Sequence, residues 1–261
     1  MKRTQANDEF LRKREARRRK IRRRRIITGL IFFLVALIAV GAVLSLTVLF
    51  PIETISAQGS EKYSSEEIVS ACGIKKGDNL FTSSVSEARL KEKLPYIESI
   101  EIVRRLPGTV LLKVKDAAEY ACYMIDGKYY AVSESGQVLN VYEQRPQELF
   151  EIRAADVKCV LGKTAEFSGE NTSELIDEIT ALANEYALSL DRIDLTDELA
   201  VTVNVEQRFS VNFGTSNNLE EKFAHLSGMI KNIDDGKTGK INLSMWTSSN
   251  TQGTFIEGSV E

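Results

Sequence analysis

The sequence predicts an α+β protein with a single N-terminal transmembrane helix. Three observations support this fold class. Charge divides sharply between a basic first tenth of the chain and an acidic remainder, and residues 26–50 contain no charged side chain. Beyond residue 50, short segments of alternating apolar residues are interspersed with amphipathic helical ones.

The segment 1–25 predicts a cytoplasmic tail that contacts the membrane. Of the 34 Lys and Arg residues in the chain, 13 lie here, beside three acidic residues, which leaves 21 basic and 34 acidic residues for the rest. A basic cluster next to a first membrane span is retained in the cytoplasm and attracts anionic phospholipids. The residues of this cluster are Arg17, Arg18, Arg19, Lys20, Arg22, Arg23, Arg24 and Arg25.

The segment 26–50 predicts the transmembrane helix, because most of its residues are Leu, Ile, Val or Phe. As a helix the segment is roughly 37 Å long, enough to cross a hydrocarbon core of about 30 Å. A cleaved signal peptide is a weaker alternative, because the possible site Ala39-Val40-Gly41 is followed by further apolar residues. The basic tail could also bind nucleic acid, but it lacks interleaved aromatic residues, so we expect no nucleic-acid partner.

The segment 52–115 predicts a strand, two helices and a β-hairpin. A strand over 52–57 precedes a helix capped by Ser64 and Glu67, the pattern of a capping box. A second helix follows Ser84 and ends at Pro95. Strands 97–106 and 109–115 flank Pro107-Gly108, which predicts a type II turn, and their alternation predicts a sheet covered on one face.

The rest of the chain predicts a second β-rich region with two helices, and its short apolar segments are separated by turn residues. An irregular stretch is expected around Arg145-Pro146 and a frayed tail after residue 248. Strands are expected at 121–124, 128–132, 137–142, 190–196, 200–205, 208–213 and 240–246, and helices at 170–188 and 219–233.

The sequence offers no candidate catalytic, cofactor-binding or metal-binding residues. His225 is the one histidine, and it lies off the apolar stripe of its helix, so we interpret it as structural. The sequence has no G-x-S-x-G motif around a nucleophilic serine, no Gly-rich phosphate-binding loop and no cluster of metal ligands. Cys72, Cys122 and Cys159 are odd in number and widely spaced, which predicts small buried residues rather than a disulfide framework. We therefore expect no enzyme and no small-molecule substrate.

Ordered motifs along the chain resemble a known family. Each is short, but they follow one another behind a basic tail and a single span. They are Ile55-Ser56-Ala57-Gln58-Gly59, Tyr63-Ser64-Ser65-Glu66-Glu67-Ile68, Ile74-Lys75-Lys76-Gly77-Asp78-Asn79-Leu80-Phe81, Leu94-Pro95-Tyr96-Ile97, Val103-Arg104-Arg105-Leu106-Pro107, Val132-Ser133-Glu134-Ser135-Gly136-Gln137-Val138-Leu139 and Phe213-Gly214. With its motifs in this order, the chain resembles the bacterial cell-division family FtsQ, called DivIB in Gram-positive bacteria.

The resemblance implies a domain plan and a role. It implies a POTRA domain at 52–118, a C-terminal β domain at 119–248 and a flexible tail at 249–261. It further implies a non-enzymatic scaffold of the division septum that binds FtsL-like and FtsB/DivIC-like single-span proteins and supports activation of septal peptidoglycan synthesis. The N-terminus would be cytoplasmic and the folded part extracytoplasmic, a type II topology in the cell membrane.

The resemblance also implies a binding site at the last strand of the β domain, where a partner adds a strand. Here that strand would hold Lys240, Ile241, Asn242, Leu243, Ser244, Met245 and Trp246. Ile241, Leu243 and Met245 are expected to face the core. Trp246 would either anchor the partner or cover the open end of its own domain.

The sequence departs from the family at two places, and other functions stay open. Residues 116–121 keep only part of the usual motif, and residues 240–246 lack its arginine, which weakens any transfer of partner contacts. The alternatives are a membrane-anchored POTRA-type adaptor of envelope assembly, a cell-wall hydrolase with an unrecognised site and a DNA-binding regulator.

Overall fold

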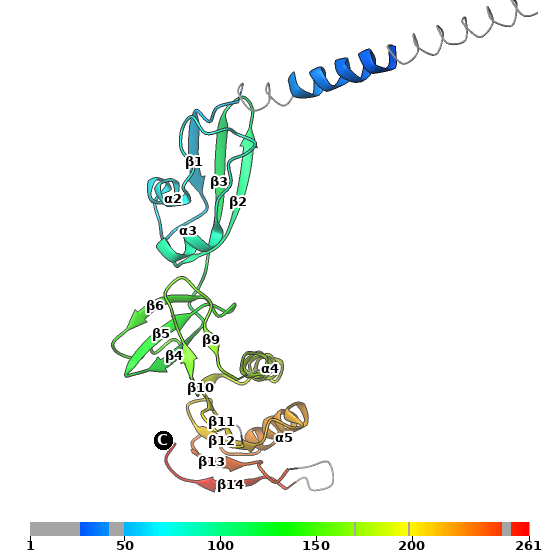
Figure 1. Ribbon diagram of the computed structural model, residues 1–261. Coiled ribbons are helices and arrows are strands. Elements are labelled where there is room, and N and C mark those ends of the chain that lie inside the picture. The colour runs from blue at the N-terminus through cyan, green and yellow to red at the C-terminus, as the bar shows by residue number, and fades with distance from the viewer. Residues whose placement is uncertain (1–26, 42–49, 170, 198, 247–251, 261) are drawn as a thin grey trace, which may run out of the picture. The chain divides into compact units, whose positions relative to one another are not determined.

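The computed structural model describes residues 27–41, 50–169, 171–197, 199–246 and 252–260. They form helices and strands in mixed order, so the predicted α+β class is confirmed (Figure 1). The basic tail predicted at 1–25, with its membrane-surface residues from Arg17 to Arg25, lies outside the described residues.

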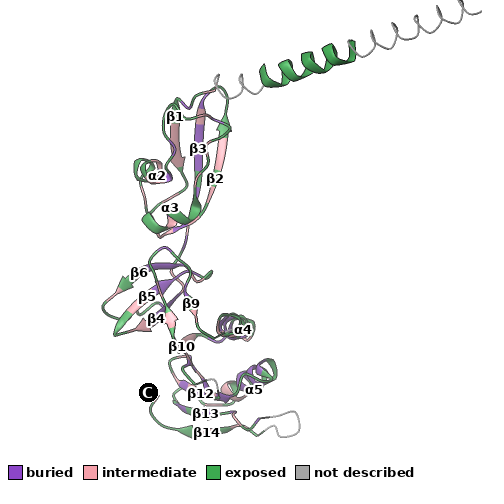
Figure 2. Cartoon of the chain, in the orientation of Figure 1, coloured by how far each residue is buried: buried purple, intermediate pink, exposed green. Residues whose placement is uncertain are grey.

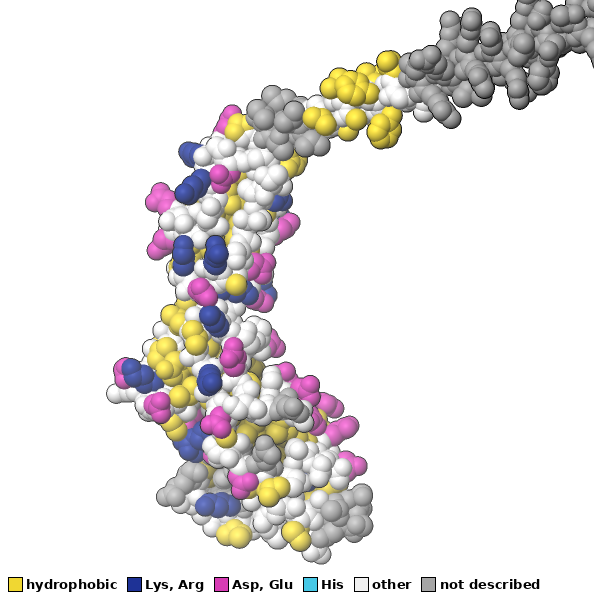
Figure 3. All heavy atoms as spheres, in the orientation of Figure 1, with side chains coloured by type: hydrophobic (Ala, Val, Ile, Leu, Met, Phe, Trp, Pro, Cys, Tyr) yellow, Lys and Arg dark blue, Asp and Glu magenta, His cyan; other side chains and the backbone are white. Residues whose placement is uncertain are grey.

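Residues 27–41 form a helix with exposed apolar side chains, among them Phe32, 77% exposed (Figure 3). Across the residues that the structure describes, no helix combines the length and the apolar character that spanning a membrane requires. Residue 26 and residues 42–49 of the predicted span lie outside the described ranges.

The chain divides into two compact units. One comprises residues up to 55 together with 74–84 and 103–111, and the other comprises 56–73, 85–102 and 112–261. This division differs from the predicted domain boundary between residues 118 and 119, which stays a prediction.

A three-stranded sheet follows the predicted order of strand, helix, helix, strand and strand. Its strands are arranged β1-β3-β2, and α2 and α3 lie along one face (Figure 1). In the central strand, Val110, Leu112 and Val114 are buried, as their alternation predicts. The elements are β1 (Thr54–Gln58), α2 (Ser65–Cys72), α3 (Glu87–Lys93), β2 (Ile97–Arg105) and β3 (Thr109–Asp116).

The predicted caps of α2 are confirmed. The Glu67 backbone N–H donates to the Ser64 hydroxyl at 3.3 Å, and the Ser64 backbone N–H donates to the Glu67 carboxylate at 2.8 Å. Gly73 ends the helix with φ 80°, a left-handed conformation that glycine adopts without strain.

The hairpin turn differs from the prediction. A type II turn needs a positive φ at Gly108, and Gly108 does not have one. Gly108 instead allows the turn to approach the backbone at Pro51 closely, since a Cβ atom at residue 108 would overlap the Pro51 carbonyl oxygen. The Gly108 carbonyl accepts N–H groups from Glu53 and Thr54, and this ties the start of β1 to the hairpin.

A nine-stranded mixed sheet makes up most of the second unit. Its order is β14-β13-β12-β11-β10-β7-β4-β5-β6, and a two-stranded β8-β9 ribbon accompanies it. The elements are β4 (Ala121–Ile125), β5 (Lys128–Val132), β6 (Val138–Tyr142), β7 (Phe150–Ala154), β8 (Val157–Lys158), β9 (Glu166–Phe167), α4 (Thr172–Glu185), β10 (Leu190–Leu195), β11 (Val201–Val205), β12 (Phe209–Gly214), α5 (Leu219–Lys231), β13 (Gly239–Asn242) and β14 (Thr254–Glu257).

Four of these strands, β7, β8, β9 and β14, are absent from the sequence prediction. β7 falls just after the predicted irregular stretch, and it pairs in parallel with both β4 and β10. It therefore joins the β4–β6 meander to the strands that follow α4. The tail expected to be frayed holds β14, which pairs antiparallel with β13.

Helices α4 and α5 lie on the same side of this sheet (Figure 1), and the core is formed between them and the strands. Buried residues occur along the strands of the sheet and in both helices (Figure 2). Phe213 of β12 and Phe223 of α5 stack with ring centroids 4.8 Å apart. The amphipathic patterns at 170–188 and 219–233 therefore predict α4 and α5 to within a few residues.

A buried carboxylate lies on the central strand β7. The Glu151 side chain is 2% exposed, and Arg153 Nε lies 2.6 Å from its Oε1. Arg192 of the neighbouring β10 places Nε 3.2 Å from Oε2, and Arg145 places Nη1 3.8 Å from the same oxygen. The bond to Glu151 raises the pKa of the Arg153 guanidinium. One carboxylate thus neutralises part of a three-arginine cluster.

We expect Glu151→Gln to lower the free energy of unfolding by about 3 kcal/mol or more, because it leaves three clustered arginines without their shared carboxylate. Urea unfolding of the full chain in detergent, followed by the fluorescence of the single tryptophan, Trp246, measures the change.

The matched control is Glu143→Gln. Glu143 forms a surface pair with Lys128 at 3.3 Å, with 80% of its side chain exposed, so its loss should cost less than about 1 kcal/mol. Equal, small effects of the two substitutions would show that the arginine cluster does not stabilise the sheet through Glu151.

Candidate partner-binding site

The predicted edge strand, residues 240–246, is not at an edge. β13 comprises Gly239–Asn242 only and lies between two strands, parallel to β12 and antiparallel to β14. The sheet ends at β14 on this side and at β6 on the other. The expectation that residues 240–246 form the open edge is therefore wrong.

The side chains of this segment follow the predicted alternation for four residues and then depart from it. Ile241 and Leu243 are buried in the core, as predicted, while Lys240 and Asn242 are exposed. Met245, expected in the core, is instead 75% exposed.

Asn242 accounts for this change of direction. Its side-chain oxygen accepts the Ser244 backbone N–H at 2.9 Å, a local turn that competes with strand pairing. The Trp246 N–H then donates to the Leu243 carbonyl at 3.0 Å, which closes the turn and places Met245 at its tip.

Trp246 belongs to the core of its own sheet. It is 8% exposed, and its ring centroid lies 6.4 Å from that of His225 on α5. Its Nε1 has no hydrogen-bond partner among the described residues. This position favours the alternative in which Trp246 covers the end of its own domain rather than anchoring a partner.

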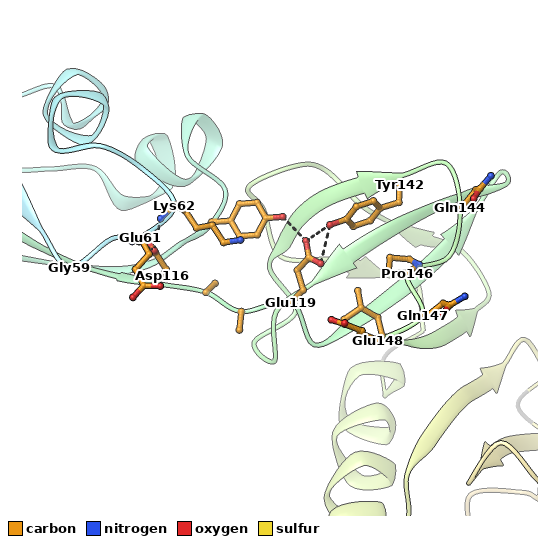
Figure 4. A pocket seen from close by; sticks show the side chains of 14 residues that line it. Gly59, Glu61, Lys62, Asp116, Glu119, Tyr142, Gln144, Pro146, Gln147 and Glu148 are labelled. Atoms are coloured by element: carbon orange, nitrogen blue, oxygen red, sulfur yellow. Dashed lines mark hydrogen bonds between the residues drawn. The ribbon is translucent and has the colours of Figure 1, made fainter.

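A second candidate is an open cleft of about 920 Å³ within the second unit, lined by both polar and apolar residues (Figure 4). Two tyrosines there share one carboxylate, since the Tyr96 hydroxyl donates to Glu119 Oε1 at 2.5 Å and the Tyr142 hydroxyl donates to the same oxygen at 2.9 Å. Burial, together with the bond to Glu119, raises the pKa of the Tyr96 hydroxyl. The Tyr96 hydroxyl therefore keeps its proton at neutral pH.

Two more charged groups of the cleft, Asp116 and Lys62, also have structural partners. Asp116 Oδ2 accepts the backbone N–H groups of Glu61 at 2.7 Å and Lys62 at 3.1 Å, and the Lys62 ammonium lies 5.0 Å from the Tyr96 ring centroid. Asp116 and Glu119 lie in the segment that departs from the family motif. Here they hold β3, β6 and the loop after β1 together, so we interpret the cleft as a structural junction.

The described residues provide few reactive groups. Burial raises the pKa of the Cys122 thiol to about 11 and that of Cys159 to about 12, and none of the three cysteines forms a disulfide. Lys222 is 2% exposed, and its ammonium donates to the carbonyls of Phe213 and Thr215 at 2.8 and 2.9 Å. Burial lowers its pKa. Within the ranges that the structure covers, no group of His, Cys, Asp and Glu could hold a metal ion.

Two residues at the end of the sheet, Phe255 and Gly239, are not predicted from the sequence. Phe255 of β14 lies on the core side of the strand, with its ring centroid 6.0 Å from that of Phe209. Gly239 of β13 leaves space for that ring. The only sequence signal is the pair Phe255-Ile256 within a polar tail.

Comparison with known proteins identifies the first sheet. Residues 50–116 match the family model described as "POTRA domain, FtsQ-type". The match begins just before β1 and ends at the last residue of β3, so it contains the complete strand–helix–helix–strand–strand unit. The expected POTRA domain is thereby confirmed.

Curated relatives match most of the chain. The chain is 22% identical over 247 residues to cell division protein DivIB of Clostridium botulinum, covering 92% of this chain and 93% of the relative. It is 27% identical over 204 residues to DivIB of Clostridium acetobutylicum, covering 75% and 80%. It is 21% identical over 216 residues to cell division protein FtsQ of Corynebacterium glutamicum, covering 79% and 89%. The predicted resemblance to the FtsQ/DivIB cell-division family is confirmed, since the POTRA domain is of the FtsQ type and these relatives are named DivIB and FtsQ.

Proposed function

We propose that this protein is a non-enzymatic scaffold of the division septum. In this role it binds FtsL-like and FtsB/DivIC-like single-span proteins and supports activation of septal peptidoglycan synthesis. The observation that carries the proposal is the match to a DivIB protein over 92% of this chain, a share that takes in most of both sheets.

The proposal includes a membrane anchor at residues 26–50 and a cytoplasmic tail. The basic cluster from Arg17 to Arg25 would contact anionic phospholipids, and the folded region would lie outside the membrane. Confinement of partners to the same membrane raises their effective concentration, so a modest contact area suffices for binding.

The proposed contact surface is the end of the nine-stranded sheet that carries β13 and β14. Exposed sheet edges bind extended peptides through backbone hydrogen bonds, and alternate side chains then provide specificity. Lys240 and Asn242 are exposed on the helix-free face of β13, where a side chain can reach a bound partner without entering the core.

We expect a fluorescent protein fused to the N-terminus to form a band at the division site in dividing cells. Deletion of residues 26–50 should abolish the band, because the fusion loses its proposed anchor. Uniform staining of the cell periphery during division would contradict the septal role.

We expect a photo-crosslinking amino acid at position 240 or 242 to capture a single-span division protein in living cells. Both side chains are exposed, so neither substitution removes a side chain from the core. Mass spectrometry of the adducts identifies the partner.

The matched control places the same amino acid at Lys128, which is exposed on β5 toward the opposite end of the sheet. It should give few adducts. Adducts of equal yield at position 128, or none at 240 and 242 while the partner still co-purifies, would move the binding site elsewhere.

A further inference from the structure

Two loops of the first unit lie beside the residues that follow the predicted span. The Leu80 N–H donates to the Phe50 carbonyl at 2.9 Å, and the Gly108 carbonyl accepts the Glu53 N–H at 2.8 Å. Backbone pairing of this kind sets neighbouring chains about 4.8 Å apart. The start of β1 and the turn between β2 and β3 lie at one end of the sheet (Figure 1). We call this end the span-proximal surface, and it consists of residues 74–81 and 104–108.

The span-proximal surface exposes two large apolar side chains. Leu106 is 67% exposed in the hairpin turn, and Phe81 is 48% exposed in the other loop. The Phe81 N–H donates to Asn79 Oδ1 at 2.9 Å, which fixes the turn that carries the ring. This ring meets that of Phe50, the last residue of the predicted span, edge to face at 5.4 Å. The apolar character of the predicted span therefore continues onto the folded unit.

The same surface is basic within an acidic region. Residues 26–261 carry 21 basic and 34 acidic residues, but the span-proximal surface has four cations and one acid, Asp78. The Arg104 guanidinium donates to the carbonyls of Leu80 and Ser83, each at 2.8 Å, so it ties the two loops together. Exposed apolar side chains flanked by cations bind the interface of anionic membranes. The four cations are Lys75, Lys76, Arg104 and Arg105.

We propose that the span-proximal surface lies against the outer headgroup layer of the membrane and binds anionic phospholipids. Leu106 and Phe81 enter the interface, and the cations contact lipid phosphates. The headgroup layer is roughly 5–7 Å thick on each side of a bilayer, so loops paired with the first residues after a span reach it. This inference rests on the membrane anchor of the proposed function and adds a second membrane contact, which restricts tilting of the POTRA domain about that anchor.

The test uses the full chain in vesicles of phosphatidylcholine and phosphatidylglycerol that carry a quencher close to the lipid headgroup. An environment-sensitive fluorescent amino acid replaces Leu106 or, as the matched control, Glu101. Glu101 is 68% exposed on β2 and lies roughly 16 Å along the strand from position 106. We expect lipid quenching to be about threefold stronger at position 106, because the headgroup layer does not extend over 16 Å.

A pair of charge variants tests the phospholipid contact. Lys76→Gln combined with Arg105→Gln should lower the quenching at position 106 by about half, and should remove its dependence on phosphatidylglycerol. Lys113→Gln combined with Lys115→Gln removes the same charge from exposed positions on β3, and should leave the quenching unchanged. Both control positions lie farther along the strand from the turn than a Debye length of about 10 Å. Thermal unfolding shows that each variant is folded.

Equal quenching at positions 106 and 101 would overturn the proposal, and so would equal effects of the two charge variants. Capture of a protein by a photo-crosslinker at position 106, without lipid quenching there, would assign the surface to a protein instead. The same fluorophore at Val35 reports on the anchor, and its lack of quenching would contradict the anchor itself. Failure of the septal role would appear as uniform staining of the fluorescent fusion, with the quenching pattern unchanged.

Discussion

The nine-stranded sheet depends on one ionic arrangement at its centre, where the Glu151 carboxylate on β7 is surrounded by Arg145, Arg153 and Arg192. β7 is the strand that joins the β4–β6 meander to β10 and everything after it. A nearly fully buried carboxylate is tolerated only because its oxygens meet guanidinium groups from two adjacent strands and the preceding loop. The parallel register that sets Arg192 beside Glu151 is therefore favoured over neighbouring registers, which would separate the charges.

The spacing of apolar residues decides which elements can be predicted from the sequence. The helices α2, α4 and α5 and the strands from β10 to β12 have apolar residues at regular spacing, and their bounds follow from the sequence to within a few residues. The sequence of β7, Phe-Glu-Ile-Arg-Ala, alternates apolar and charged residues over five positions, a short strand signal that the prediction overlooks. Alternating charges normally indicate a solvated face. Here Glu151 is buried by partners such as Arg192, which lies on another strand and far away along the chain, and single-sequence periodicity contains no information on that pairing.

The prediction of the sheet end fails for a different reason. A run from Lys240 to Trp246 alternates well enough to predict a strand of seven residues, but the Asn242 side chain binds the Ser244 backbone and ends the strand early. The prediction of an open edge fails because β14 comes from a tail rich in Gly, Ser and Thr, a composition typical of frayed termini. β14 pairs with β13 where Gly239 leaves space for the strand, and that long-range contact has no local signal in the tail.

An edge strand presents unpaired N–H and C=O groups that invite pairing with any extended chain. β14 takes that position here, because it covers the outer side of β13 and leaves only four residues at the edge. The Phe255 ring contacts Phe209 of the core, and the Glu257 carboxylate lies 3.6 Å from the Lys237 ammonium. A short edge strand that carries charged side chains limits indiscriminate pairing, so this end of the sheet is protected without a further covering element.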